Sequence, residues 1–139
     1  MTCHSIVFIS EATVNLNEQA LLLLLGQARA EHQRAGFTGL LLYHEGQFLQ
    51  VLEGPEAPLR EFFARIALDP RHCKLQKLAD GPKPQRDFSG WYMSFKRSAS
   101  AGPAPPNYLA FSDLLAAVDS TQMQHLLREF LAESNVLLR

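Results

Sequence analysis

The feature that most constrains the fold is a pair of apolar runs around a short turn, FTGLLLYHEGQFLQVLEG, at residues 37–54. In the turn HEGQ, Gly46 can take a positive φ, so the segment predicts a β-hairpin. Side chains alternate between the two faces of a strand, and both faces of the second run are apolar apart from Gln50. The hairpin is therefore expected inside a sheet that is covered on both sides.

Gln50 then poses a chemical question. Its amide has two donors and an oxygen acceptor, and leaving them unpaired in an apolar wall costs about 1–3 kcal/mol. One candidate partner is a backbone group or a trapped water, and the other is a bound ligand.

The segments around the hairpin alternate between strand and helix patterns. Asn17 is suited to cap the first helix and Gly36 to end it, and Pro55 fits the first turn of the second. The predicted elements are a strand at 4–10, a helix at 18–34, the hairpin at 37–54, a helix at 55–71, and strands at 73–80 and 88–96.

This order predicts an α+β fold of the ferredoxin-like class, a split βαβ arrangement with a five-stranded sheet and two main helices. Residues 1–96 would form this domain. Residues 97–106 are rich in proline and small side chains and are expected to be a linker. Residues 107–139 carry apolar side chains at helical spacing, so a C-terminal helical cap is expected, packed on the domain or on a partner.

Charge and cysteine content exclude several classes of protein. The formal net charge is −1, so nothing attracts nucleic acid or an anionic membrane. The two cysteines lack a C-x-x-C spacing, and no signal peptide or membrane span is visible, which predicts a cytoplasmic protein with free thiols.

Patterns typical of enzymes and of metal sites are also missing from the sequence. There is no G-x-S-x-G, H-E-x-x-H or phosphate-binding glycine loop, and the five histidines lack ligand spacing. Glu31, Glu53 and Asp69 stand singly at element ends, where carboxylates usually cap or remain solvated. We therefore expect neither catalysis nor a metal.

What remains is a candidate pocket. Gln50 lies in the sheet, Arg71 and His72 follow the second helix, and Trp91 and Met93 lie on the last strand. Phosphate oxygens and a planar ring would suit groups of these kinds.

Three stretches together resemble a known family. GFTGLLLYHEGQFLQVLEGP, IALDPRH and FSGWYMSF are similar to the BLUF domain, a flavin-binding blue-light sensor, over residues 4–96. The resemblance implies a flavin, FAD or FMN, between the two long helices. It also implies the following cofactor-site residues: Gln50 on the ring, Trp91 and Met93 as the switching pair, Ser10 after the photoactive position, and Arg71 and His72 near the flavin tail.

The sequence departs from this family at two places. Phe8 stands where the family has a photoactive tyrosine, and a phenyl ring has no hydroxyl to give up a proton. Glu31 and His32 stand where the family has an asparagine that pairs with the polar edge of the flavin ring. An imidazole makes one hydrogen bond where an amide makes two, so weaker flavin binding is expected. Phe8 and His32 complete the candidate cofactor site.

Two functions follow from this comparison. The first is a BLUF-type flavin-binding blue-light sensor with an impaired photocycle, which signals through contacts with an unknown protein and forms a homo-oligomer. The alternative is a flavin-free protein–protein interaction module that has kept the BLUF-like surface. The presence of bound flavin would separate them.

Overall fold

The computed structural model has five strands and four helices in its described part, which comprises residues 3–14, 16–97, 103–105, 107–114, 116, 118 and 120–137. The elements are β1 (Cys3–Ala12), α1 (Glu18–Ala35), β2 (Thr38–His44), β3 (Gln47–Gly54), α2 (Glu56–Ala67), β4 (His72–Lys83), β5 (Trp91–Ser94), α3 (Phe111–Leu114) and α4 (Thr121–Leu137).

The sheet has the strand order β4-β1-β3-β2-β5, so the predicted ferredoxin-like fold is confirmed. The four strands of the split βαβ units pair antiparallel, and β5 extends the sheet by pairing parallel with β2. As predicted, the hairpin strands β2 and β3 lie inside the sheet.

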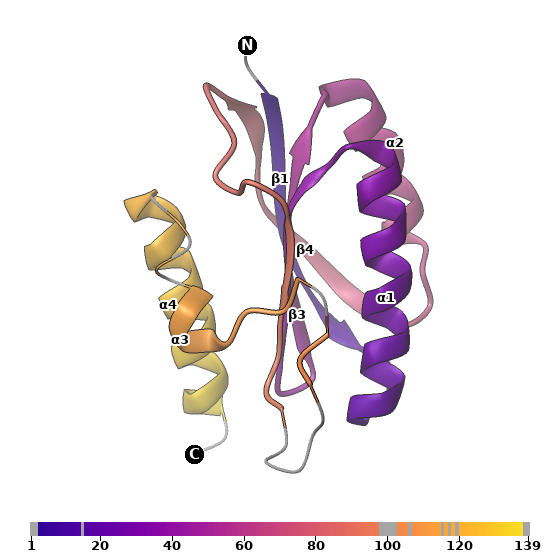
Figure 1. Ribbon diagram of the computed structural model, residues 1–139, viewed down its shortest axis with the longest axis vertical. Helices are drawn as coiled ribbons and strands as arrows, with labels where there is room; N and C mark the ends of the chain where they lie inside the picture. Colours follow the sequence, from indigo (N-terminus) through magenta and orange to yellow (C-terminus); the bar gives the residue numbers. More distant parts are fainter. Residues whose placement is uncertain are drawn as a thin grey trace.

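Helices cover both faces of this sheet, with α1 and α2 on one face and α3 and α4 on the other (Figure 1). The alternation along β3 explains why, since Phe48 and Leu52 join the core under α1 and α2 while Leu49 and Val51 join the core under α4. Leu127 and Phe130 of α4 are buried in this second core. The C-terminal helices therefore pack on the domain itself.

Local chemistry sets the ends of the first helix and the hairpin turn as predicted. The Asn17 side chain accepts a hydrogen bond from the Ala20 N–H at 2.8 Å and so caps α1. Gly36 ends this helix with φ +74°, and Gly46 takes φ +82° in the hairpin turn.

Three predicted boundaries differ from the structure by three residues or more. The second helix ends at Ala67 and not at residue 71, because Pro70 disfavours helical backbone at the residue before it. The fourth strand continues through Pro82 to Lys83, because it pairs with β1 along its length. The last strand begins at Trp91 and not at residue 88. The predicted linker at 97–106 lies largely outside the described residues.

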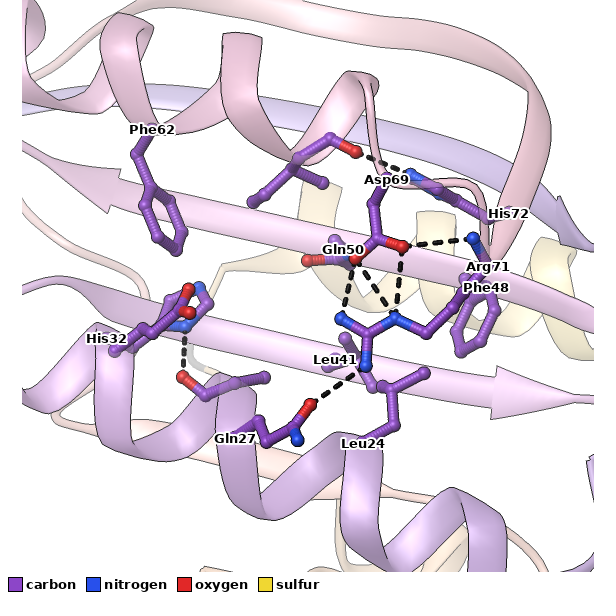
Figure 2. Close-up of a pocket in the computed structure, with 13 residues that line it drawn as sticks. Leu24, Gln27, His32, Leu41, Phe48, Gln50, Phe62, Asp69, Arg71 and His72 are labelled. Atoms are coloured by element: carbon purple, nitrogen blue, oxygen red, sulfur yellow. Dashed lines mark hydrogen bonds and ion pairs between the residues drawn. The ribbon is translucent and has the colours of Figure 1, made fainter.

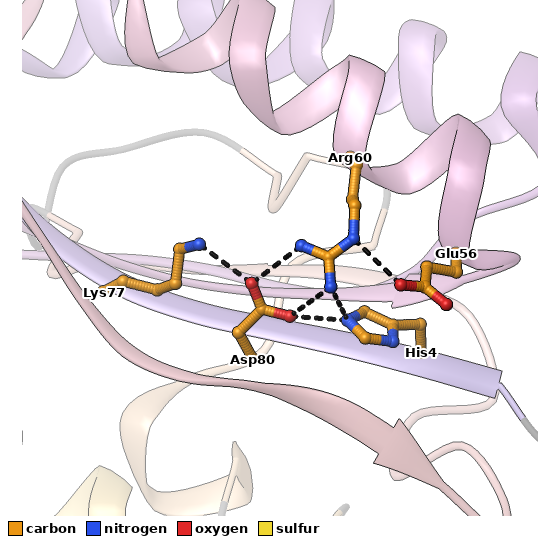
Figure 3. A network of polar contacts seen from close by, with 5 residues as sticks. All are labelled: His4, Glu56, Arg60, Lys77 and Asp80. Carbon is orange, nitrogen blue, oxygen red and sulfur yellow. Dashed lines mark hydrogen bonds and ion pairs between the residues drawn. The ribbon is translucent and has the colours of Figure 1, made fainter.

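A polar network joins α2 to the edge of the sheet (Figure 3). Asp80 of β4 accepts hydrogen bonds from Arg60 of α2 at 3.0 and 3.1 Å and from Lys77 at 2.8 Å, and it contacts His4 of β1 at 2.6 Å. Glu56 accepts a further hydrogen bond from Arg60 at 3.0 Å. These donors hold the pKa of Asp80 well below its usual range. The network fixes α2 over the strands whose other ends reach the candidate site.

Candidate functional site

A cavity of about 80 Å³ lies between α1, α2 and the sheet. Figure 2 shows that its side chains come from both helices, from β2 and β3, and from the turn between α2 and β4. The lining residues are Leu24, Gln27, Ala28, Glu31, His32, Leu41, Phe48, Gln50, Phe62, Ile66, Asp69, Arg71 and His72.

Gln50 forms part of the floor of this cavity. Its neighbours across the ladder are Phe8 on β1 and Leu41 on β2, and only 6% of the residue is exposed. Within the described part of the chain, its amide makes no side-chain hydrogen bond, and neither a backbone group nor another side chain satisfies it. Its donors and acceptor are therefore available to a molecule in the cavity.

His32 closes one end of the cavity from the last turns of α1. Its ring stacks on Trp91 with the centroids 3.6 Å apart and meets the edge of Phe62 at 4.7 Å. Nδ1 lies 2.6 Å from the Ala28 carbonyl oxygen, which can only accept, so we assign the proton to Nδ1. Nε2 is then an acceptor, and it is buried without a partner among the residues that the structure describes. Burial lowers the pKa of His32 to about 4, so the ring is neutral near pH 7.

Arg71 lies at the opposite end of the cavity (Figure 2). Its guanidinium pairs with the Asp69 carboxylate, with Nη2 2.6 Å from Oδ2, and Nη1 donates to the Gln27 side chain at 2.9 Å. The contact with Asp69 lowers the pKa of that carboxyl. Arg71 thus connects the turn after α2 to α1. The D-x-R spacing in the sequence carried a signal for the pair with Asp69, but no sequence pattern indicated Gln27.

His72 and Ser10 satisfy each other beside the cavity. His72 Nε2 lies 2.7 Å from the Ile66 carbonyl oxygen, so it carries the proton, and Nδ1 accepts the Ser10 hydroxyl hydrogen at 2.7 Å. The imidazole therefore joins β1 to the last turn of α2, and its face remains against the cavity.

The other three predicted site residues lie behind the cavity wall. Phe8 is fully buried on β1 and packs edge-to-face on Phe63 at 5.2 Å. Trp91 and Met93 lie on β5 in the same core, each 2% exposed. Gln50, His32, Arg71 and His72 thus line the cavity directly, whereas Trp91 reaches it through its stack with His32.

Among the residues that the structure describes, no three His, Cys, Asp or Glu side chains gather closely enough to hold a metal ion. No helix in that part of the chain is long and apolar enough to span a membrane.

Comparison with known proteins gives one consistent family. The BLUF family, described as sensors of blue-light using FAD, matches residues 3–94. The chain is 29% identical over 133 residues to the photoactivated adenylate cyclase subunit beta-like protein FB of Euglena gracilis, covering 90% of this chain and 16% of that protein. It is 34% identical over 61 residues to the blue light- and temperature-regulated antirepressor BluF of Escherichia coli K12, covering 44% of this chain and 15% of that protein.

The fold is similar to a solved structure, Klebsiella pneumoniae BlrP1 with FMN and cyclic diGMP. The TM-score is 0.73 at 26% sequence identity, and the match covers 94% of this chain and 34% of that chain. The chain therefore spans only a small part of the length of these relatives.

Proposed function

Because the chain belongs to the BLUF family of flavin-binding blue-light sensors, we propose that its cavity between α1 and α2 holds a flavin, FAD or FMN, and that the protein signals through contacts with another protein. The observation that carries this proposal is that two residues lining the cavity, Gln50 and His32, each have a polar group, the side-chain amide and Nε2, with no partner among the described residues. A bound flavin supplies the absorption of blue light.

The residues present fit a flavin by their chemistry. The polar edge of the ring system carries two carbonyl groups on either side of one N–H. Gln50 can donate to a carbonyl, and His32 Nε2 can accept the N–H. Arg71 can exchange its contact with Gln27 for a phosphate oxygen of the flavin tail, since a guanidinium pairs well with phosphate.

The size of the cavity sets a cost on this binding. Its volume is about 80 Å³, whereas ligand pockets usually measure about 300–1,000 Å³. The side chains between the helices must therefore move apart to admit the ring, and the contact between Arg71 and Gln27 must open. This observation favours the second candidate function, a flavin-free interaction module.

We further propose that Phe8 impairs the photocycle. Its phenyl ring is packed against Phe63 and has no proton to transfer. Glu31, which also lines the cavity, adds a carboxylate near an edge of the flavin that carries two carbonyl acceptors, and a carboxylate beside those carbonyls is repulsive. Phe8 and Glu31 both act against an efficient light response.

The contacts of β5 support signalling through the C-terminal helices. The Met93 N–H donates to the Asn107 carbonyl at 2.9 Å, and the Leu109 N–H donates to the Met93 carbonyl at 2.8 Å. The segment that leads to α3 and α4 is thus attached to the strand that carries Trp91. In this proposal a protein partner contacts α4 or the edge of the sheet, and a second copy of the chain is one such partner.

The BLUF domain itself is a sensor and not a catalytic unit, and we propose no enzymatic activity for the described residues. Cys3 and Cys73 are both unpaired, and Cys73 is exposed, which supports a reducing compartment such as the cytoplasm.

The test is flavin uptake followed by illumination. Protein purified without flavin is mixed with FAD or FMN and passed through a desalting column, and the absorbance of the protein fraction is recorded before and after blue light. Retained yellow absorbance supports the sensor. Colourless protein that retains neither flavin supports the flavin-free module and overturns the proposal.

A further inference from the structure

Glu53 is a fully buried carboxylate on β3, whereas its sequence position suggested a capping or solvated group. Its place in the strand puts it on the face of the sheet opposite the cavity, in the same row as Leu49 and Val51. A buried carboxylate is costly unless donors surround it, so its partners indicate what it does.

All partners of Glu53 are donors, and two of them are backbone groups of the segment before β5. Its oxygens accept the Asp87 N–H at 2.6 Å and the Phe88 N–H at 3.1 Å. The Thr38 hydroxyl donates to it at 3.0 Å. A second attachment lies close by, because Arg86 donates to the Thr38 hydroxyl at 3.0 Å and to the Gly36 carbonyl at 3.1 Å.

The neighbouring Asp87 carboxylate does not compete with Glu53 for the backbone N–H groups of this segment. The Asp87 side chain forms an ion pair with Lys83. The backbone N–H groups of Asp87 and Phe88 donate to Glu53 instead. Burial raises the pKa of Glu53, while the Asp87 and Phe88 N–H groups and the Thr38 hydroxyl oppose that rise.

The segment held by Glu53 ends directly at Trp91. The Gly90 carbonyl accepts the Gly39 N–H at 3.0 Å, and Trp91 follows as the first residue of β5. A Cβ atom at Gly39 would lie 3.3 Å from the indole ring, so the ring passes closely over this glycine. The same ring also stacks on His32. Trp91 therefore has little room, and a shift of the segment before it must displace the indole.

We propose that Glu53 is a positioning residue, which holds the segment 87–90 against the sheet and thereby fixes the Trp91 indole behind the cavity. Glu53 and Gln50 lie three positions apart on the same strand, so one strand provides both the cavity floor and the anchor for the ring behind its wall. Glu53 has this role in the flavin-free protein, independently of flavin binding.

Trp91 is the single tryptophan of the chain, so its fluorescence reports this position without interference from another indole. The experiment compares wild type with Glu53→Gln in the flavin-free full chain, by emission maximum and by quenching with acrylamide. Glutamine keeps the shape but has only one acceptor oxygen, so at least one backbone donor loses its partner. Loss of a hydrogen bond to a charged group shifts a local opening equilibrium by roughly tenfold to a hundredfold.

The expected result is a red-shifted emission and stronger quenching in Glu53→Gln at unchanged far-ultraviolet circular dichroism. Thr38→Val removes one donor to Glu53 and one acceptor of Arg86 but leaves both backbone bonds to Glu53 in place, so it should give a smaller change in the same direction. It replaces Glu53→Gln as the test variant if Glu53→Gln does not fold. Asn17→Ala is the control, since it removes the cap of α1, a backbone N–H bond to a side-chain oxygen, without touching this segment.

Three outcomes decide the matter. Greater exposure of Trp91 in the Glu53 and Thr38 variants, but not in Asn17→Ala, supports the proposal. Unchanged Trp91 fluorescence in folded Glu53→Gln overturns it, because His32 stacking alone would then hold the ring. Equal changes in all three variants also overturn it, because they would report general loosening. Failure to bind flavin would leave each of these readings intact.

Discussion

Acid should destabilise this protein through His32. Its imidazole is packed between Trp91 and Phe62, and burial lowers its pKa from 6.5 to about 4. Between these two values the unfolded chain binds a proton that the folded protein does not. The contribution of the neutral ring is therefore complete above about pH 6.5 and is lost progressively as the pH falls towards 4.

The size of this effect follows from the shift. One pKa unit corresponds to about 1.4 kcal/mol, so the lowering from 6.5 to about 4 amounts to about 3 kcal/mol of unfolding free energy. That is a large part of the stability of a domain of this size, which is typically about 5–15 kcal/mol.

Urea unfolding of the flavin-free protein from about pH 7.5 down to about pH 4 measures it, with His32→Phe as the matched variant. Phenylalanine keeps an aromatic ring against Trp91 but cannot bind a proton. Other groups titrate in both proteins, including Asp69 with its lowered pKa and Glu53 with its raised pKa. The difference in unfolding free energy between the two proteins therefore isolates His32.

We expect the unfolding free energy of wild type to fall by about 3 kcal/mol relative to that of His32→Phe between about pH 7.5 and about pH 4. A difference that stays constant across the range would show that His32 is hydrated or paired in the folded protein, and would refute the arrangement described at the end of the cavity.

Two further predictions concern light and the C-terminal helices. With flavin bound, wild type should show no reversible red shift of its absorbance under blue light, because Phe8 lacks a hydroxyl. The double variant Phe8→Tyr with His32→Asn should show such a red shift. A red shift in wild type would contradict this prediction. Removal of residues 107–139 should expose the core face that α3 and α4 cover, where each fully buried apolar side chain contributes about 1.5–3 kcal/mol. Light scattering should then report aggregation. A truncated chain that stays monomeric and equally resistant to urea would show that these helices are dispensable for stability.

The sequence predicted the fold well where local chemistry and periodicity agree. Asn17 and Gly36 marked α1 because capping depends on one side chain and one backbone conformation. The apolar pattern on both faces of the hairpin predicted a sheet covered on both sides, because burial depends on alternation alone.

Predictions failed where distant partners decide the structure. We expected the last strand to begin at residue 88, but the Phe88 N–H donates to the Glu53 side chain, 35 residues earlier in the chain. The predicted strand at 73–80 stopped before Pro82, yet Pro82 fits at the edge of the sheet because an edge strand has unpaired positions. Spacing along the chain carries no information on such contacts.

The candidate site was predicted in part for the same reason. The residue types and the family resemblance together indicated Gln50, His32, Arg71 and His72, which do line one cavity. It gave no indication of the contact between Arg71 and Gln27 or of the stack between His32 and Trp91, because both depend on the packing of α1 over the sheet. These contacts determine the volume available to a ligand.

The most direct test of the central claim, that the cavity at Gln50 holds a flavin, compares wild type with Gln50→Leu. Flavin absorbance after reconstitution and the urea midpoint of the flavin-free protein are measured on the same preparations. Because the Gln50 amide has no side-chain hydrogen bond within the described residues, the substitution should leave the midpoint unchanged or raise it. Flavin occupancy or the flavin spectrum should change. An unchanged spectrum together with a lowered midpoint would contradict the account, because Gln50 would then serve the fold and not the cofactor.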